Sequence, residues 1–440
     1  MKGRAMGSFH TAYWHSTPGG FTKKDRAGGR YRWYLPTFLA DDTLPMSSEA
    51  TSSASRAGKL IASLFNLGSR AASTEGIARL LLRAEAVSSS HIEGLTIGTR
   101  RILRAELYED EPPNLRFDRS AVEVIGNIHA MEAAIEEAER DEAMAVDTFK
   151  RIHRALCKGT RIEQVGGTIR TEQNWVGGSG FNPLSAAYVP PAPEHVEALL
   201  DDLAQFCNRD DVDPVVKAAM AHYQFESIHP FPDGNGRTGR ALIHTILRRD
   251  LPECDYVPPI SLVLATYRSE YIRHLTAMRT DDPSLETDAR NEWIAFFSGC
   301  CERAAGEMTE LAAEMEQLRQ GWAERLGSVR SGSALELMLF EVQGSPVFSI
   351  SSMARLTGRS FPAVNGAVSA LLDAGIAKET SKGKRNRVFE VPEVIGYFNL
   401  LERRLASRAG SIKVSKPARR VPFRDEARYE SRRNSDAPEG

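Results

Sequence analysis

The fold of this chain is decided by residues 229–240, which read HPFPDGNGRTGR. An apolar helical pattern over 215–228 ends at two prolines, and a second helical pattern begins at Thr238. Between them, Gly234 and Gly236 allow positive φ and a close approach of the backbone. A glycine-rich turn directly before a helix aims several N–H groups at one point, which predicts a phosphate-binding site.

Four side chains of this stretch fit the same chemistry. Arg237 and Arg240 are three residues apart, so they share a helix face, and their guanidinium groups match phosphate oxygens. Asp233 is a hard carboxylate beside the expected phosphates and suits Mg²⁺. His229 titrates near neutral pH and is able to accept a proton from a hydroxyl. The stretch thus predicts a base, a metal ligand and a phosphate site together.

Other interpretations of the motif fit less well. The spacing of Gly234, Gly236 and Gly239 matches a dinucleotide fingerprint, but that fingerprint follows an apolar strand and not a helix. A Walker A loop ends in Gly-Lys-Ser/Thr, which this stretch lacks. His229 alone would be read as a packed or capping residue, and only the phosphate-type residues behind it favour a catalytic role.

Residues 229–240 resemble the signature of Fic (Fic/DOC) domains, His-Pro-Phe-x-Asp/Glu-Gly-Asn-Gly-Arg-x-x-Arg, without a gap. The resemblance implies a protein adenylyltransferase that uses ATP and Mg²⁺ to transfer AMP to a Ser, Thr or Tyr hydroxyl. It implies that His229 is the catalytic base and that Asp233 holds the metal. The nucleotide-binding residues implied in this stretch are Asp233, Gly234, Asn235, Gly236, Arg237, Thr238, Gly239 and Arg240.

The segment Ser89-x-x-x-Glu93-Gly94 resembles the inhibitory helix of the same family. The resemblance implies that Glu93 pairs with Arg240 and occupies the place of the γ-phosphate, while Ser89 steadies the helix. A lone Ser-x-x-x-Glu pattern is common, so the interpretation depends on the main motif.

Two further segments resemble parts of the family. Residues 171–191 resemble the flap, a hairpin to which a protein substrate adds a strand. The flap residues expected at the nucleotide are Val176, Gly177, Gly178 and Ser179. Tyr271 lies where many relatives have a tyrosine pair, but Ile272 follows it here, and an aromatic residue of the core is the alternative.

Hydrophobic periodicity predicts a mainly α chain followed by a winged-helix-like domain, and the resemblance implies that the helical part is a Fic core with a β-hairpin flap. The expected divisions are an irregular N-terminal arm (1–45), a helical region with the inhibitory motif (46–120), the Fic core (121–320), the winged-helix-like domain (328–400) and a disordered basic tail (401–440). The predicted wing carries Lys378, Lys382, Lys384, Arg385 and Arg387.

Composition sets the remaining expectations. A net charge of −2, five cysteines without metal spacing, and no long apolar run indicate a cytoplasmic protein that does not bind membranes. DNA binding through 328–400 stays open, and so does a DNA-binding regulator whose Fic core senses nucleotide. Self-modification, a homodimer, removal of AMP, and transfer of UMP or phosphocholine are also left open, and the target protein is not given by the sequence.

Overall fold

The structure is a computed structural model that describes residues 7–406, except 17, 65–73, 109–118, 253–257 and 382–386. The middle of the predicted wing and the tail beyond residue 406 lie outside the described residues.

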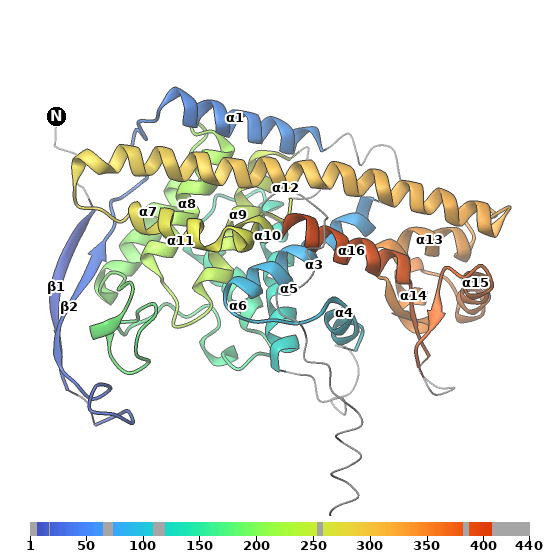
Figure 1. Cartoon of the computed structure of the whole chain (residues 1–440), viewed down its shortest axis with the longest axis horizontal. Helices are drawn as coiled ribbons and strands as arrows, with labels where there is room; N and C mark the ends of the chain where they lie inside the picture. The colour runs from blue at the N-terminus through green and yellow to red at the C-terminus, as the bar shows by residue number, and fades with distance from the viewer. Residues whose placement is uncertain are drawn as a thin grey trace, which may run out of the picture.

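A bundle of helices forms the central part of the molecule (Figure 1). It contains α5 (Arg119–Ala138), α6 (Val146–Cys157), α7 (Val196–Cys207), α8 (Pro214–Ile228) and α9 (Asn235–Asp250). Nearly every residue of α8 is buried, so this helix is the centre of the core. Asp213 caps its first turn by accepting from the amides of Val215 and Val216, and Pro214 occupies the first helical position.

The other helices of this part surround the bundle. They are α1 (Ser48–Ser63), α3 (Thr74–Ile92), α4 (Thr99–Leu107), α10 (Ile260–Thr266), α11 (Arg268–Ala277) and α12 (Pro283–Leu326). In Figure 1, α12 runs along the whole length of the molecule, with α1 beside it. One continuous helix therefore joins the Fic-like part to the C-terminal part, across the boundary predicted near 320–328.

The sequence predicts an irregular N-terminal arm, and this prediction is wrong for the part of the arm that forms strands. It is a hairpin in which β1 (Ser8–Trp14) pairs antiparallel with β2 (Gly29–Leu35). Aromatic pairs across and beside the strands, such as Phe9 with Tyr34 at 5.0 Å between ring centroids, stabilise it. The prediction failed because the arm gains its order from the flap, which is distant in sequence: the Tyr34 amide donates to the Val189 carbonyl at 3.0 Å.

The flap itself, residues 171–191, is mostly irregular. Among its described residues, the predicted hairpin is represented by one isolated antiparallel β-bridge, between Val176 and Tyr188. Three short 3-10 helices lie nearby, η1 (Glu163–Val165), η2 (Pro183–Ser185) and η3 (Pro193–His195).

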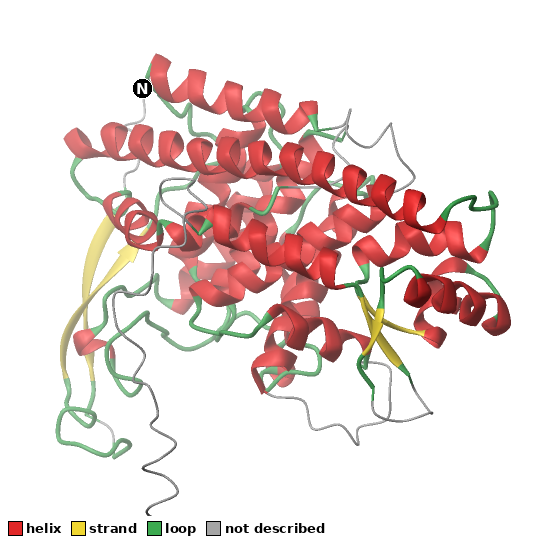
Figure 2. Cartoon of the chain, turned by 45° about the vertical axis from the view of Figure 1, so that its right-hand side comes forward, coloured by secondary structure: helices red, strands yellow, loops and turns green. Residues whose placement is uncertain are grey.

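The C-terminal part has three helices and a small sheet (Figure 2). Its elements are α13 (Ala334–Gly344), β3 (Val347–Ser349), α14 (Ile350–Thr357), α15 (Phe361–Asp373), β4 (Lys378–Glu379) and β5 (Val388–Glu390), with strand order β3-β5-β4. The predicted order of three helices and a hairpin is present, and β3 is an addition. A further helix, α16 (Pro392–Leu405), returns to pack on α12 and extends the ordered chain past the predicted end at 400.

This C-terminal part also touches the helix that carries the inhibitory motif. Arg83 of α3 donates to the carbonyl of Gly344 at the end of α13, and Gly76 lies against Gly344. No helix within the described ranges is long and apolar enough to cross a membrane.

Candidate active site

The turn between α8 and α9 has the geometry that an anion site requires. His229 ends α8 in the left-handed region with φ 50°, and Gly234 has φ 80° just before the first residue of α9. A Cβ on Gly234 would lie 2.8 Å from a methyl carbon of Leu156, so only glycine fits. The helix begins at Asn235 and not at the predicted Thr238, which places the glycine-rich residues in its first turn.

Polar side chains from inside and outside the motif hold this turn. Asn235 closes it by bonding both the amide and the carbonyl of Phe231, each at 2.8 Å. Arg170 donates to the His229 carbonyl at 2.9 Å, and Asn174 donates to the same carbonyl at 3.2 Å and to the Phe231 carbonyl at 3.0 Å. Arg170 and Asn174 were missed by the sequence analysis, because nothing in their local sequence shows which carbonyls they reach.

His153 of α6 also stabilises the turn, through a hydrogen bond and a ring contact. Its Nδ1 accepts from the Gly167 amide, so its Nε2–H donates to the Asp233 carbonyl at 2.9 Å. The ring stacks on Phe231 at 3.8 Å between centroids. Burial lowers the pKa of His153 to about 4, so the ring is neutral and keeps this donor arrangement at neutral pH.

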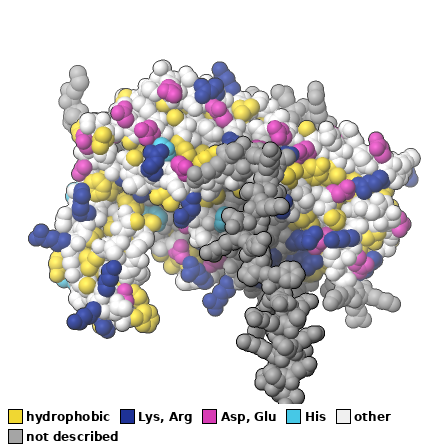
Figure 3. All heavy atoms as spheres, in the orientation of Figure 1, with side chains coloured by type: hydrophobic (Ala, Val, Ile, Leu, Met, Phe, Trp, Pro, Cys, Tyr) yellow, Lys and Arg dark blue, Asp and Glu magenta, His cyan; other side chains and the backbone are white. Residues whose placement is uncertain are grey.

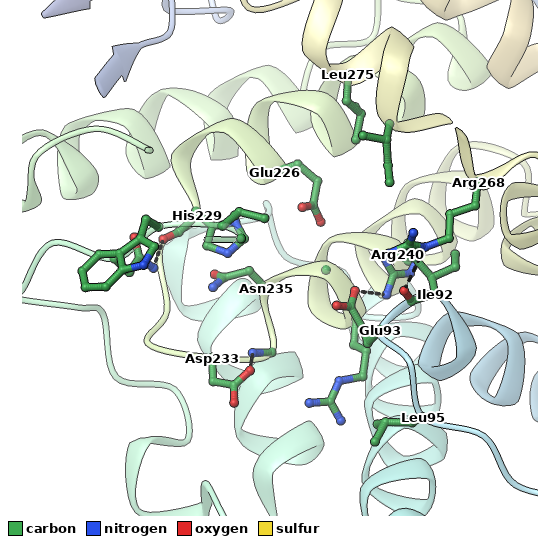
Figure 4. Close-up of a pocket in the computed structure, with 18 of the residues that line it drawn as sticks. Ile92, Glu93, Leu95, Glu226, His229, Asp233, Asn235, Arg240, Arg268 and Leu275 are labelled. Atoms are coloured by element: carbon green, nitrogen blue, oxygen red, sulfur yellow. Dashed lines mark hydrogen bonds and ion pairs between the residues drawn. The ribbon is translucent and has the colours of Figure 1, made fainter. Parts of the chain in front are cut away.

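The motif opens onto a cavity of about 680 Å³ (Figure 4). Its walls come from the end of α3, the flap, the turn and α11. The lining residues relevant below are Glu93, Val176, Gly177, Glu226, His229, Asp233, Arg237, Arg240, Tyr271 and Arg279.

His229 faces this cavity as a neutral imidazole. Burial, together with the nearby guanidinium groups of Arg279 and Arg170, lowers its pKa to about 4. A neutral ring is the protonation state that a base needs, although a pKa of about 4 makes the free base a weak acceptor.

Arg240 is buried against the segment that carries Ser89 and Glu93. It is 1% exposed, its Nη2 donates to Glu93 Oε1 at 2.7 Å, and its Nε donates to Ser89 Oγ at 2.9 Å. The Ser89 carbonyl accepts a further bond from the same guanidinium at 2.9 Å. Ser89 therefore binds Arg240 directly, in addition to any effect on the helix.

Glu93 lies at the first turn of α9 (Figure 4). A Cβ on Gly236 would collide with Glu93 Oε1, so the carboxylate is placed against the backbone of the glycine-rich turn. Burial raises the pKa of Glu93, but Arg240 and Arg237 together outweigh it, so the pKa is lowered and the carboxyl is charged at neutral pH. A carboxylate thus occupies the anion position that the motif predicts.

The second arginine is also engaged. Arg237 is 4% exposed and pairs with Glu123 of α5 at 3.0 Å. Arg161 bridges Glu123 at 3.2 Å and Asp233 at 2.9 Å, and it is largely exposed. Sequence analysis missed Glu123 and Arg161, whose contacts are made across the fold.

Asp233 has the properties of a Mg²⁺ ligand that acts with a nucleotide. Its carboxylate is 43% exposed at the cavity wall. One oxygen accepts a hydrogen bond from the Gly234 amide, and the other forms an ion pair with the exposed side chain of Arg161. Within the described residues, no three His, Cys, Asp or Glu side chains gather as a metal site. A single carboxylate fits Mg²⁺, which takes its other ligands from phosphates and water.

Glu226 is a cavity residue that the sequence analysis missed. It lies three residues before His229 on the last turn of α8, and Figure 4 shows its carboxyl between His229 and Arg240. Its buried Oε1 has no hydrogen-bond partner among the described residues. Burial raises its pKa to about 7, against the opposing effect of Arg240. In the sequence, the i, i+3 spacing of Glu226 and His229 was the feature that could have indicated that the two side chains share a face.

Several predicted nucleotide contacts do not reach the cavity. Thr238 donates to the Gly234 carbonyl inside α9, and Gly239 faces α8, where a Cβ would lie 2.9 Å from Glu226. Gly178 and Ser179 lie farther along the flap, and Ser179 donates to Asp25 of the arm.

The remaining predicted contacts do line the cavity. Outside the motif they are Val176 and Gly177 of the flap and Tyr271 of α11, and within the motif they are Asp233, Gly234, Asn235, Gly236, Arg237 and Arg240. Tyr271 is 3% exposed, and its hydroxyl bonds His222 at 2.8 Å, so only its ring is presented. Both the nucleotide contact and the core aromatic remain compatible with this position.

The fold and the site define a helical protein whose glycine-rich helix N-terminus, two arginines and neutral histidine form a nucleotide-phosphate type of site. Residues 143–247 match the model of the Fic/DOC family, and residues 51–136 match the model of the Fic/DOC family N-terminal region. The chain therefore carries a Fic/DOC domain together with the N-terminal region of that family.

The chain is also similar in sequence to proteins that are named after this family. The chain is 30% identical over 197 residues to protein adenylyltransferase fic-1 of Caenorhabditis elegans, which covers 43% of this chain and 35% of the relative. It is 29% identical over 224 residues to protein adenylyltransferase Fic of Aedes aegypti, covering 48% and 38%. The chain thus spans little more than a third of the length of each.

Solved structures of the family are also similar. A Fic family protein from Desulfovibrio desulfuricans G20 aligns with a TM-score of 0.48 at 19% identity, over 79% of this chain and 97% of that one. Fic-1 of Caenorhabditis elegans aligns with a TM-score of 0.45 at 23% identity, over 59% and 71%.

Proposed function

We propose that this chain is a protein adenylyltransferase that transfers AMP from ATP to a Ser, Thr or Tyr hydroxyl of a protein. The observation that supports this most directly is the placement of a neutral His229 and a buried Arg240 on one cavity, around the glycine-rich first turn of α9. The relatives named protein adenylyltransferase support the same reaction class.

In the proposed reaction, the hydroxyl oxygen attacks the α-phosphorus of ATP. The hydroxyl proton passes to His229, the bond from the α-phosphorus to the bridging oxygen breaks, and pyrophosphate leaves. The backbone amides at the start of α9 hold phosphate oxygens, and Arg237 and Arg240 hold the β- and γ-phosphates. Asp233 would hold Mg²⁺, which neutralises phosphate charge when bound. Positioning and charge stabilisation supply most of the rate.

His229 gains basicity from this charge distribution. Its pKa of about 4 belongs to the nucleotide-free site, where burial is the largest cause of the shift and the charges of Arg279 and Arg170 add to it. Phosphate charge in the cavity opposes those two cations, so the pKa rises as ATP binds. The base becomes stronger when its substrate is present.

The same site explains a restrained resting state. Arg240 pairs with Glu93 and Arg237 pairs with Glu123, so both cations are engaged before ATP arrives. Productive binding requires at least the Glu93 pair to open, because its carboxylate would repel the γ-phosphate. We propose that Glu93 and Ser89 act as an internal brake.

Labelling with radioactive ATP tests the function. With Mg²⁺ and cell extract, label in the α-position should enter protein, and label in the γ-position should not. His229→Ala should abolish the signal, while the matched control His91→Ala, an exposed histidine on α3, should keep it. Label from γ-ATP, or full labelling by His229→Ala, would contradict the proposal. Parallel lanes with α-labelled UTP and labelled CDP-choline separate AMP from the other groups.

The DNA-binding alternative has less support in the structure. Helix α15 carries no Lys or Arg. Two cations of the wing are engaged by acids, Lys378 with Glu390 at 3.8 Å and Arg387 with Glu379 at 2.7 Å. Contacts of α13 with α3 favour an interaction role for this part of the chain.

A further inference from the structure

The arm formed by β1 and β2 is fastened to the flap along its length. At the tip, Asn182 donates to the carbonyls of Lys24 at 2.9 Å and Asp25 at 2.8 Å. Midway, Trp14 packs edge-on against Trp175 with ring centroids 5.4 Å apart. At the base lies the bond from the Tyr34 amide to Val189, described above. Arm and flap therefore form one wall.

A second hollow, of about 560 Å³, lies between arm and flap. The flap supplies an apolar floor from Pro183, Leu184, Ala186, Ala187 and Val189. The arm supplies Phe9, Tyr31 and two exposed cations, Arg30 and Arg32. We call this hollow the arm groove.

The arm groove and the catalytic cavity share the flap. Val176 lines the cavity, Tyr188 lines the groove, and these two residues form the backbone bridge of the flap. A polypeptide that lies in the groove is therefore beside the cavity in which the acceptor hydroxyl must sit.

The arm is strongly positive. Its exposed cations are Lys23, Lys24, Arg26, Arg30 and Arg32. Its acid, Asp25, is bonded to Thr22 and Ser179. Across the described part of the chain, none of the five cations takes part in an ion pair. The whole chain has a net charge of −2, so this is a local concentration of charge. Figure 3 shows Lys and Arg side chains around the lobe at the lower left, where Figure 1 has the hairpin.

We propose that the arm groove is a second docking site for the protein substrate, and that it takes an acidic segment with an apolar side chain. This inference rests on the proposed function. The apolar floor receives the apolar side chain, while the five cations attract the flanking carboxylates and raise the rate of encounter. Strand addition to the flap selects substrate segments by their extended backbone shape, and the arm would select among them by their negative charge.

A nucleic acid is the less suitable occupant. Stacking of bases needs open aromatic faces. In the groove, Arg32 already covers the Phe9 ring at 4.4 Å, and the neighbouring Trp33 is stacked on His10 at 4.4 Å and on His195 at 5.6 Å. The apolar floor matches a side chain better than a phosphate backbone.

Peptide binding tests the site. The probe is a fluorescein-labelled peptide with one leucine flanked by four glutamates, compared with a peptide that has glutamines instead. The acidic peptide should bind the full chain about tenfold more tightly at low salt, and the difference should shrink at high salt. The double variant Arg30→Glu/Arg32→Glu should remove the difference. The matched control, Lys59→Glu/Arg330→Glu, changes the charge equally at exposed positions away from the groove and should keep it.

Transfer kinetics supply a second measurement. The acidic peptide with an added tyrosine should be labelled from α-ATP with a KM about tenfold below that of the glutamine peptide. Arg30→Glu/Arg32→Glu should raise this KM, whereas the control Lys59→Glu/Arg330→Glu should leave both the KM and the self-labelling unchanged.

Three results would overturn the proposal: equal binding of the two peptides, no effect of the double reversal, or tighter binding of an oligothymidylate than of the acidic peptide. The last would assign the arm to single-stranded nucleic acid. If wild type and Glu93→Gly show no labelling at all, the proposed function fails, while the binding experiment still decides whether the groove selects acidic chains.

Discussion

Replacement of Glu93 by glycine tests the internal brake. In the structure, the Glu93 carboxylate forms an ion pair with Arg240 at 2.7 Å and lies against the backbone of Gly236. Glu93→Gly removes the carboxylate and leaves Ser89 as a partner of Arg240. We expect more self-labelling and tighter binding of ATP.

The size of the effect follows from the bond that ATP must break. A hydrogen bond to a charged group contributes about 1.5–3 kcal/mol. Because Arg240 is 1% exposed and Glu93 is 41% exposed, solvent screens one side of the pair, which favours the lower part of that range. Each 1.4 kcal/mol is about a tenfold change, so the lower half of that range corresponds to a rise in apparent ATP affinity of about ten- to fortyfold.

The assay is self-labelling from α-labelled ATP at matched ATP and Mg²⁺, together with calorimetry of ATP binding. Glu93→Gln removes the charge but keeps the size, and should give a smaller gain. His91→Gly places a glycine at an exposed neighbouring position of the same helix end and controls for flexibility. Adding Arg240→Ala to Glu93→Gly should remove the gain, because the freed arginine is what binds the γ-phosphate.

Equal labelling by wild type and Glu93→Gly would refute the brake. A gain in His91→Gly as large as that in Glu93→Gly would refute the electrostatic reason for it, since loosening of α3 would then be sufficient.

Four further outcomes are expected. His229→Ala should abolish transfer while the calorimetric Kd for ATP changes by less than about threefold, because the ring acts on the hydroxyl; a large loss of binding would contradict this role. Because burial lowers the pKa of His229 to about 4 and Glu93 opposes that shift, the His229 titration in kcat/KM of Glu93→Gly should appear only at about pH 4 or below. A midpoint near 7 that persists in Glu93→Gly/Glu226→Gln, which lacks the carboxyl with a pKa of about 7, would show that the base is another group. Gly234→Ala should lower the free energy of unfolding in urea by about 1–3 kcal/mol, because φ is 80° and the new methyl meets the core; an unchanged midpoint would refute the strain. Burial lowers the pKa of His222 from 6.5 to about 3, so its contribution to stability is complete above pH 6.5 and is lost as the pH falls towards 3. About 2 kcal/mol of this contribution should be lost by about pH 5. The difference in thermal stability between about pH 7 and about pH 5 should therefore be smaller in His222→Gln than in the wild type.

The sequence predicts the backbone of the turn well because the motif is contiguous. Prolines, glycines and the helix that follows determine backbone directions over a few residues, so an anion site at 229–240 needs no knowledge of the rest of the chain. The pairing of Glu93 with Arg240 was a prediction from a family resemblance, and the structure has that pair at 2.7 Å.

The sequence predicts the arm poorly for the opposite reason. Residues 8–35 have alternating aromatic and polar residues, but an isolated two-stranded hairpin is only marginally stable. Its order comes from contacts with 175–189, far away in the chain. The same separation hid α16, which is held by α12 and α3.

By itself, the sequence determined which groups meet at the turn between α8 and α9, since short-range sterics set the backbone there. Tertiary structure alone decided the electrostatic state of that site. The lowered pKa of His229, the raised pKa of Glu226 and the engagement of Arg237 by Glu123 all arise from burial and from charges on other helices. Desolvation and Coulomb interactions depend on distance in space, which the order of residues does not give.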